Sequence, residues 1–217
     1  MGLYPYEIKV SSESLGSKEI PGSGRCDCYA MIVKVMETIG SLIRKLRSSE
    51  PKLVRQAIEE LRVRGWLEDG SLKGISLCHA HLFGADLFKA DLSQVDLHQA
   101  DLSYADLSLS NLHRAKFGRS QMLYVNLSKA DLTGADLFKV NMLGSRNVLP
   151  EQLRSAKRMY GAILPHGGIY DGRYQLSGDL EFARWGRIDI QDNEAMAEFY
   201  GVSLIAYLRG QEESHLY

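Results

Sequence analysis

Cysteine and histidine side chains are the ones whose spacing could bind a metal ion or do nucleophilic chemistry. They cluster at only two places, Cys26-x-Cys28 and Cys78-His79-x-His81. Paired zinc-binding cysteines are usually separated by two to four residues, so the C-x-C pair does not match. No glycine-rich phosphate loop, nucleophile elbow or Ser/His/Asp arrangement accompanies them. The sequence therefore predicts that the chain is not an enzyme and holds no metal ion or cofactor.

Aspartates form the other regularly spaced set, and they belong to a repeat. Residues 70–144 read as fifteen consecutive five-residue units, among them ADLFK, ADLSQ and ADLSY. The second position of the unit is Asp seven times and Asn three times. A side chain that stabilises a turn by hydrogen bonding tolerates this exchange, whereas a catalytic carboxylate does not. We therefore expect the aspartates to support turns.

The repeat also dictates how the backbone must run. The third position is Leu twelve times, and the first is Ala eight times. A period of five fits neither the helix nor the strand, and either would scatter the leucines over several faces. A backbone that turns once per unit instead returns each leucine to the same interior, where the small first residue leaves room beside it.

The pattern A(D/N)LXX resembles that of the pentapeptide-repeat family. The resemblance implies a mainly β fold, a right-handed quadrilateral β-helix with four units per coil. It further implies that the Leu and the small residue point inward and that the second position points outward. Residues twenty apart should then stack, which would place Leu107 and Leu127 in one inner column and make Asp86 and Asp106 the only pair of adjacent carboxylates.

The flanking sequences predict α-helical caps at both ends of this solenoid. We expect a flexible N-terminal segment over residues 1–25, a helical hairpin cap over 26–69, the β-helix over 70–149 and a helical C-terminal cap over 150–217. The hairpin should start its second helix near Pro51 and bury Val54, Ala57, Ile58 and Leu61. A partner-binding helical module and a dimerisation arm are the alternatives for the two flanks.

The C-terminal flank should contain several short amphipathic helices. The run LPEQLRSAKRMYGAILP predicts the first of them, with an acidic residue early and basic residues late. The buried side of the later helices should be formed by Met196, Phe199, Tyr200, Leu204, Tyr207 and Leu208.

Charge and apolar length exclude several classes of protein. The chain has 26 Lys and Arg residues against 27 Asp and Glu, a net charge of -1, which argues against direct nucleic-acid binding. No apolar run approaches the roughly 20 residues that span a bilayer, and no signal-peptide pattern is expected at the N-terminus. Three cysteines form no even disulfide framework. These features predict a cytoplasmic protein without membrane contact.

Two functions rank ahead of a third possibility, a structural or regulatory appendage that acts through its helical ends. The first is a non-enzymatic scaffold for protein–protein interaction, which presents a flat solenoid face to a protein partner that the sequence does not name. The alternative comes from the family resemblance: quinolone-resistance members imitate DNA and bind type II topoisomerases. Residues 70–149 contain seven Asp, five Lys and three Arg, so this region is not acidic. A DNA mimic needs a sustained negative field, and we therefore rank it second.

Outward apolar side chains are expected to collect on one side of the rod and to form the partner-binding surface. This surface would be the site of a partner, a homodimer contact, or a face covered by the chain's own termini. The predicted residues are Phe83, Phe88, Tyr104, Leu109, Leu123, Tyr124 and Leu143.

Overall fold

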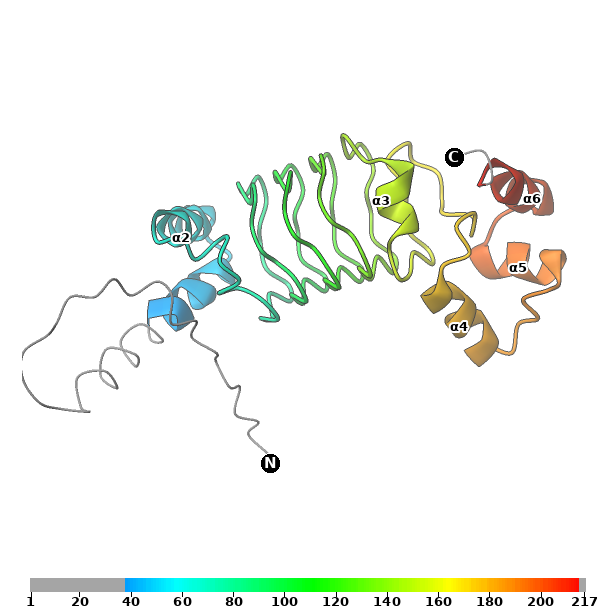
Figure 1. Cartoon of the computed structure of the whole chain (residues 1–217), viewed down its shortest axis with the longest axis horizontal. Coiled ribbons are helices and arrows are strands. Elements are labelled where there is room, and N and C mark those ends of the chain that lie inside the picture. Colours follow the sequence, from blue (N-terminus) through cyan, green and yellow to red (C-terminus); the bar gives the residue numbers. More distant parts are fainter. Residues whose placement is uncertain (1–37, 215–217) are drawn as a thin grey trace, which may run out of the picture. The chain divides into compact units, whose positions relative to one another are not determined.

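The computed structural model describes residues 38–214, so Cys26, Cys28 and the predicted segment 1–25 lie outside the described residues. The helices of this part flank a stack of coils (Figure 1). A first helical stretch covers residues 38–46 and is followed by α2 (Pro51–Val63), α3 (Pro150–Arg154), α4 (Ser177–Trp185), α5 (Asn193–Tyr200) and α6 (Leu204–Glu213). Within residues 38–214, no helix is long and apolar enough to cross a membrane.

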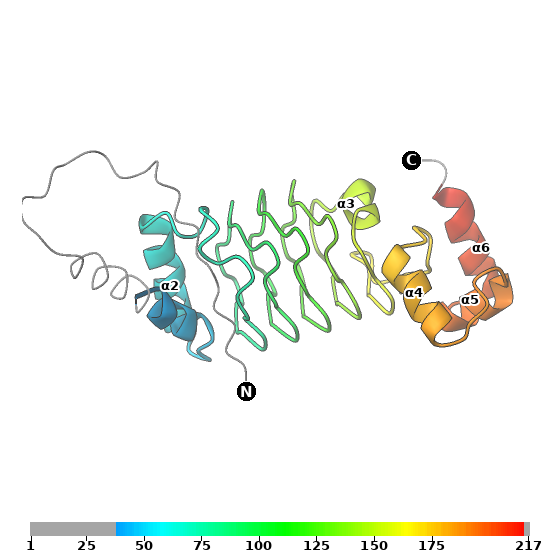
Figure 2. The same ribbon diagram turned by 60° about the horizontal axis from the view of Figure 1, so that its bottom comes forward.

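Parallel β-bridges between successive coils build the central stack, which both views show edge-on (Figures 1 and 2). Each second-position residue pairs with the one twenty positions later, from Ser76 with Asp96 through Asn126 with Arg146. Twenty residues per coil are four units, as predicted. The bridges are single residues separated by turns, because each side of the coil is only one unit long.

Leucines fill the interior of the coils, as predicted. All fifteen third-position side chains, from Leu72 to Met142, are buried. The first-position side chains between Ala80 and Val140 are buried beside them. A large and a small residue therefore alternate around the interior of each coil, as close packing requires.

A backbone hydrogen bond closes the turn at each corner, and a side-chain hydrogen bond supports it where the second position is Asp or Asn. The third-position carbonyl accepts from the first residue of the next unit, as from Ala105 N to Leu102 O at 2.9 Å. The fifth residue of all fifteen units is left-handed, with φ between 52° and 71°, which is the geometry of a type II turn. Every second-position Asp or Asn also accepts the N–H two residues later, as Asp101 does from Ser103 at 3.0 Å. The predicted turn-supporting role of the aspartates is confirmed.

The bridge ladder continues beyond residue 149, where the sequence predicted the β-helix to end. Asp136 pairs with Arg158 and Asn141 pairs with Ile163, twenty-two residues apart instead of twenty. α3 occupies only Pro150–Arg154 and forms an enlarged corner of this last coil. The predicted helix over LPEQLRSAKRMYGAILP is therefore wrong after Arg154, because the backbone there returns to the ladder.

Arginine side chains close the N-terminal edge of the stack. Ser76, Asp86 and Phe88 carry carbonyls that lack the N–H of a preceding coil. Arg47 donates to the carbonyl of Ser76, and Arg62 of α2 donates to those of Asp86 at 2.9 Å and Phe88 at 3.3 Å. The face of α2 that packs here buries Val54, Ala57, Ile58 and Leu61, as predicted.

A carboxylate closes the C-terminal edge. Met159 and Tyr160 have N–H groups with no following coil to accept them, and the side chain of Asp179 in α4 accepts both, at 3.1 Å and 2.8 Å. Gly178 N donates to Lys157 O at 3.0 Å and extends the same closure. Unpaired strand edges invite association, and side chains from the flanking segments pair with backbone groups at both edges of this stack.

The C-terminal helices bury most of the side chains predicted for them. Met196, Tyr200 and Tyr207 are buried, and Phe199 and Leu204 are half-buried. The prediction that Leu208 is buried is wrong. Its side chain is 39% exposed, because only one side of α6 faces α5 and the last coil.

The buried hydroxyl of Ser120 predicts a change that should stabilise the interior of the β-helix. Its hydroxyl is fully buried and has no hydrogen-bond partner, whereas the hydroxyl of Ser110 donates to Leu107 O at 2.6 Å. Because a buried unpaired hydroxyl is unfavourable, Ser120→Ala should raise the free energy of unfolding by about 1 kcal/mol. Ser110→Ala is the control, and it should be neutral or destabilising. Urea titration measures both, and a loss of stability in Ser120→Ala would contradict the unpaired state.

Candidate functional site

Three exposed aromatic rings form a ladder along one corner of the coils. Phe83 and Tyr104 have ring centroids 5.3 Å apart, and Tyr104 stacks on Tyr124 at 5.0 Å. The three side chains are 62%, 54% and 44% exposed. We call Phe83, Tyr104 and Tyr124 the aromatic ladder.

The local backbone explains why these rings point to solvent. Tyr104 and Tyr124 occupy the left-handed fifth position, which lies on the outside of the corner. The Tyr124 ring then lies over Gly144, where an added Cβ would be 2.5 Å from the ring. Glycine at 144 therefore lets the last ring lie flat against the next coil.

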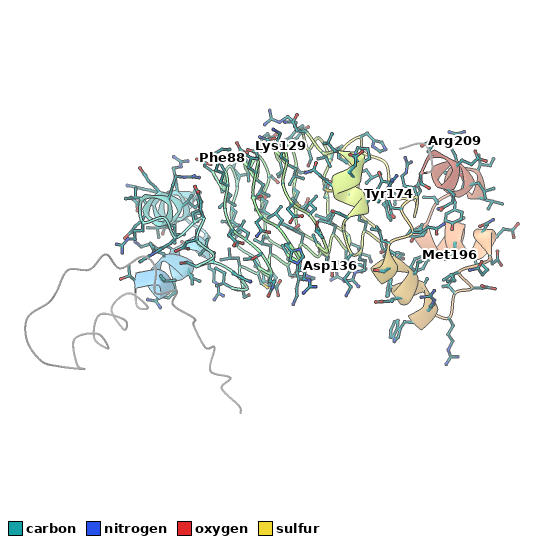
Figure 3. All side chains as sticks on the ribbon, in the orientation of Figure 1. Phe88, Lys129, Asp136, Tyr174, Met196 and Arg209 are labelled. Carbon is teal, nitrogen blue, oxygen red and sulfur yellow. The ribbon has the colours of Figure 1, made fainter. Side chains whose placement is uncertain are left out.

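The remaining predicted residues divide between two neighbouring corners. Leu123 and Leu143 lie on the corner of the ladder, half-buried and 42% exposed respectively. Phe88 and Leu109 lie on the next corner, half-buried and 44% exposed. Figure 3 shows Phe88 on the same side of the coils as Lys129, with Asp136 on the opposite side. The structure thus brings five of the seven predicted residues to one corner.

A groove that the sequence did not predict adjoins the ladder. It has a volume of about 600 Å³ and lies between α2 and the first coils, with Val54, Arg55 and Ile58 on one wall and His81, Phe83 and Asp101 on the other. Phe83 belongs to both the groove and the ladder. No sequence pattern could have indicated the groove, because it depends on how α2 packs against the coils.

A second aromatic stack lies on another corner and is covered. Phe138 stacks on Tyr160 at 5.8 Å, and Phe182 of α4 and Phe199 of α5 pack on Tyr160 at 5.1 Å and 4.6 Å. Phe138 is half-buried as a result. The chain itself therefore shows that an aromatic stack on a coil corner can seat the side chains of a packed helix.

Metal-ligating groups do not converge in the part of the chain that the structure describes. Within residues 38–214, no group of three or more His, Cys, Asp or Glu side chains is placed to hold a metal ion. The thiol of Cys78 is half-buried and lies 3.3 Å from the Ser76 hydroxyl.

Three features define a β-helical solenoid with helical ends. They are the single-residue bridges between coils, the inward leucines and the turn at every fifth residue. A family model for pentapeptide repeats, with eight copies, matches residues 67–99, 90–122 and 124–146. Residues 67–146 therefore consist of pentapeptide repeats of the kind that this family model describes.

Solved structures similar to the chain include two members of that family. HetL, a pentapeptide repeat protein involved in heterocyst differentiation regulation in the cyanobacterium Nostoc sp. strain PCC 7120, is 32% identical, with a TM-score of 0.40 over 44% of this chain and 43% of HetL. A pentapeptide repeat protein from the thylakoid lumen of Arabidopsis thaliana is 18% identical, with a TM-score of 0.40 over 52% of this chain and 74% of that one. The chain therefore spans less than half the length of HetL. No curated protein matches it.

Proposed function

We propose that the chain is a non-enzymatic scaffold in the cytoplasm and that it binds a protein partner through the aromatic ladder and the leucines beside it. The observation that carries the proposal is the exposure of three aromatic rings in mutual contact along one corner of the coils. Aromatic side chains are favoured anchors at protein interfaces, and their rigidity limits the entropy lost on binding. The family resemblance agrees, since pentapeptide repeats are mostly non-catalytic.

The covered stack supports this reading by comparison. Phe138 and Tyr160 occupy the same kind of corner as the ladder and are packed under α4 and α5. The ladder also brings neighbouring rings into contact, with Tyr104 stacked on Tyr124 and Phe83 tilted against Tyr104, yet Phe83 and Tyr104 stay more than half exposed. An exposed copy of a surface that the chain elsewhere packs against helices is well suited to an external partner.

DNA mimicry is supported less well. The outward columns alternate Asp with uncharged or basic residues, as in Asp91, Asn111 and Asp131, and Asp96, Lys116 and Asp136. The single pair of adjacent carboxylates, Asp86 and Asp106, is relieved by Arg62, which lies 2.9 Å from Asp86. A continuous negative stripe of the kind that duplex DNA presents is therefore missing from these columns.

The double variant Tyr104→Glu/Leu123→Glu tests the proposed function. It should weaken partner binding by about tenfold or more, since buried interface anchors each contribute roughly 2 kcal/mol. Its melting temperature should stay close to that of the wild type, because both side chains point outward. Affinity capture from the host with quantitative mass spectrometry measures the loss, and sedimentation velocity measures self-association.

Gln94→Glu/Gln99→Glu is the matched control. It adds the same charge at two exposed fifth positions on other corners and should bind like the wild type. A large loss of stability in the ladder variant would mean that the corner is already covered within the chain. Unchanged binding and unchanged stability would contradict the proposed site.

A further inference from the structure

The repeat unit at residues 115–119 departs from the pattern at its second position. Lys116 is the one lysine or arginine among the fifteen second positions, ten of which are Asp or Asn. In those ten units the side chain accepts the N–H two residues later, as Asp96 does from His98 at 3.1 Å. An ammonium group has no acceptor atom, so Lys116 is unable to make this bond.

The N–H of Gly118 is consequently left without the acceptor that most turns provide. It donates none of the hydrogen bonds formed within residues 38–214. The half-buried ring of His98 lies beside Gly118, with Nδ1 2.5 Å from the position of an added Cβ, but it accepts no bond from this N–H. A buried N–H without a partner is unfavourable, and an external acceptor would satisfy it.

Lys116 also belongs to a group of cations without ionic partners, which we call the basic cluster: Arg114, Lys116 and Arg119. The two arginines occupy the left-handed corners that bound this side of the coil. All three side chains are exposed and take part in none of the ion pairs formed within residues 38–214. With the neighbouring coils included, the column of Lys116 and its two corner rows carry five cations against two carboxylates, namely Arg114, Lys116, Arg119, Lys139 and Arg158 against Asp96 and Asp136.

The last coil shows how the chain satisfies such an N–H when the second residue is basic. Arg158 stands in the same column as Lys116, two coils later. The fourth-position N–H of that unit belongs to Tyr160, and the carboxylate of Asp179 in α4 accepts it at 2.8 Å. A carboxylate from a distant segment therefore replaces the missing Asp of the repeat. No carboxylate of residues 38–214 does the same for the N–H beside Lys116.

We infer that the basic cluster binds a carboxylate side chain in an acidic segment of a partner protein. This carboxylate accepts the N–H of Gly118, as the side chain of Asp179 does in the last coil. Lys116 and Arg119 pair its negative charge. An extended segment places side chains on one face every second residue, about 6.6 Å apart. A second carboxylate two residues along the segment then reaches Arg114, which precedes Lys116 by two residues.

The basic cluster and the aromatic ladder face different ways. Asp136, which follows Lys116 in its column, lies on the side of the coils opposite Phe88 and Lys129 (Figure 3). The ladder lies on the corner after Arg119. The inference therefore goes beyond the proposed function, because it adds a second surface for a segment of different chemistry.

Fluorescence anisotropy with defined peptides on the full chain tests the inference. The probe is a fluorescein-labelled octapeptide of alternating Glu and Ser, and its Gln/Ser counterpart measures binding without charge. At low ionic strength, where charges are little screened, the Gln peptide should bind at least about tenfold more weakly than the Glu peptide. In ¹⁵N-labelled protein, the amide proton of Gly118 should shift downfield on titration with the Glu peptide, because it gains a charged acceptor.

Lys116→Asn removes the charge and restores the acceptor. Asn111 accepts the N–H of His113 at the same repeat position, so the variant should fold with an unchanged or higher melting temperature. It should weaken the Glu peptide about tenfold, because a charge-assisted hydrogen bond and an ion pair are lost together. Arg119→Gln should weaken it about threefold. Lys129→Gln, the matched control, removes one charge from a fifth position on the opposite side and should change binding by less than about twofold.

Four outcomes would overturn the inference. They are the absence of binding to the Glu peptide, equal binding of the Glu and Gln peptides, equal effects of Lys116→Asn and Lys129→Gln, and a bound peptide that leaves the Gly118 amide unshifted. A twelve-base-pair DNA duplex that binds more tightly than the Glu peptide and is lost with Lys116→Asn would also overturn the assignment to an acidic protein segment. None of these variants alters the ladder, so the proposed function is judged separately.

Discussion

Leu107→Ala should lower the free energy of unfolding by about 4 kcal/mol, near the upper end of measured large-to-small core substitutions. Leu107 is fully buried, and the bridges of Asp86, Asp106 and Asn126 place it between Leu87 and Leu127 in one inner column. Its backbone is tied on both sides, as by the bond from Leu107 N to Asn126 O at 2.9 Å. The coil therefore cannot collapse into the cavity, which is why we expect a large effect.

Leu109→Ala is the matched control for Leu107→Ala. It makes the same substitution in the same unit, but Leu109 is 44% exposed and points away from the interior. Leu109→Ala should lower the free energy of unfolding by less than about 1 kcal/mol, as most surface substitutions do. Urea titration with an unchanged slope measures both variants. Equal effects would mean that the inward and outward assignments are wrong.

Asp179→Ala should lower the free energy of unfolding by about 2–5 kcal/mol at pH 7, because it leaves the buried N–H of Met159 and the partly buried N–H of Tyr160 without an acceptor. In an inner coil, the third-position N–H donates to the next coil and the fourth-position N–H donates to the Asp or Asn of its own unit. The last coil has no successor and carries Arg158 at that second position. The carboxylate of Asp179 replaces both missing acceptors.

Stability should also depend on pH through Asp179. Burial raises the pKa of its carboxyl to about 6, against the opposing effect of the hydrogen bonds from Met159 and Tyr160. The folded chain then binds more protons than the unfolded chain between about pH 4 and pH 6, so this group's contribution to stability falls as the pH rises through that range. The difference in unfolding free energy between wild type and Asp179→Ala should therefore shrink by up to about 3 kcal/mol between pH 4 and pH 7.

Two variants serve as controls for this prediction. Asp179→Asn keeps one carbonyl acceptor and should lie between the wild type and Asp179→Ala at pH 7. Asp189→Ala removes an exposed carboxylate that accepts one N–H, from Gln191 at 2.9 Å, and should cost less than about 1 kcal/mol. A difference between wild type and Asp179→Ala that stays constant from pH 4 to pH 7 would contradict the raised pKa.

The sequence alone determined the solenoid, because each of its features repeats over five residues. A buried leucine, a small neighbour and a turn-supporting Asp or Asn recur in every coil, so local chemistry is enough to predict the inward face and the stacking of residues twenty apart. The outward position of Phe83, Tyr104 and Tyr124 follows from the same frame. The predicted first helix of the C-terminal flank ends early, at Arg154, because the residues after it form bridges to Asp136 and Asn141 far back in the chain.

Only the tertiary structure decided how the ends are closed and which corner stays open. The arginines that satisfy the first coil, the carboxylate of Asp179 and the groove beside α2 all depend on where a helix packs against the coils. Those contacts join residues that are distant in sequence, and no local period encodes them. The C-terminal helices pack on Phe138 and Tyr160 and leave Tyr104 exposed, although both corners carry aromatic side chains. Exposure of an outward residue depends on what packs over it, and a repeat pattern does not contain that information.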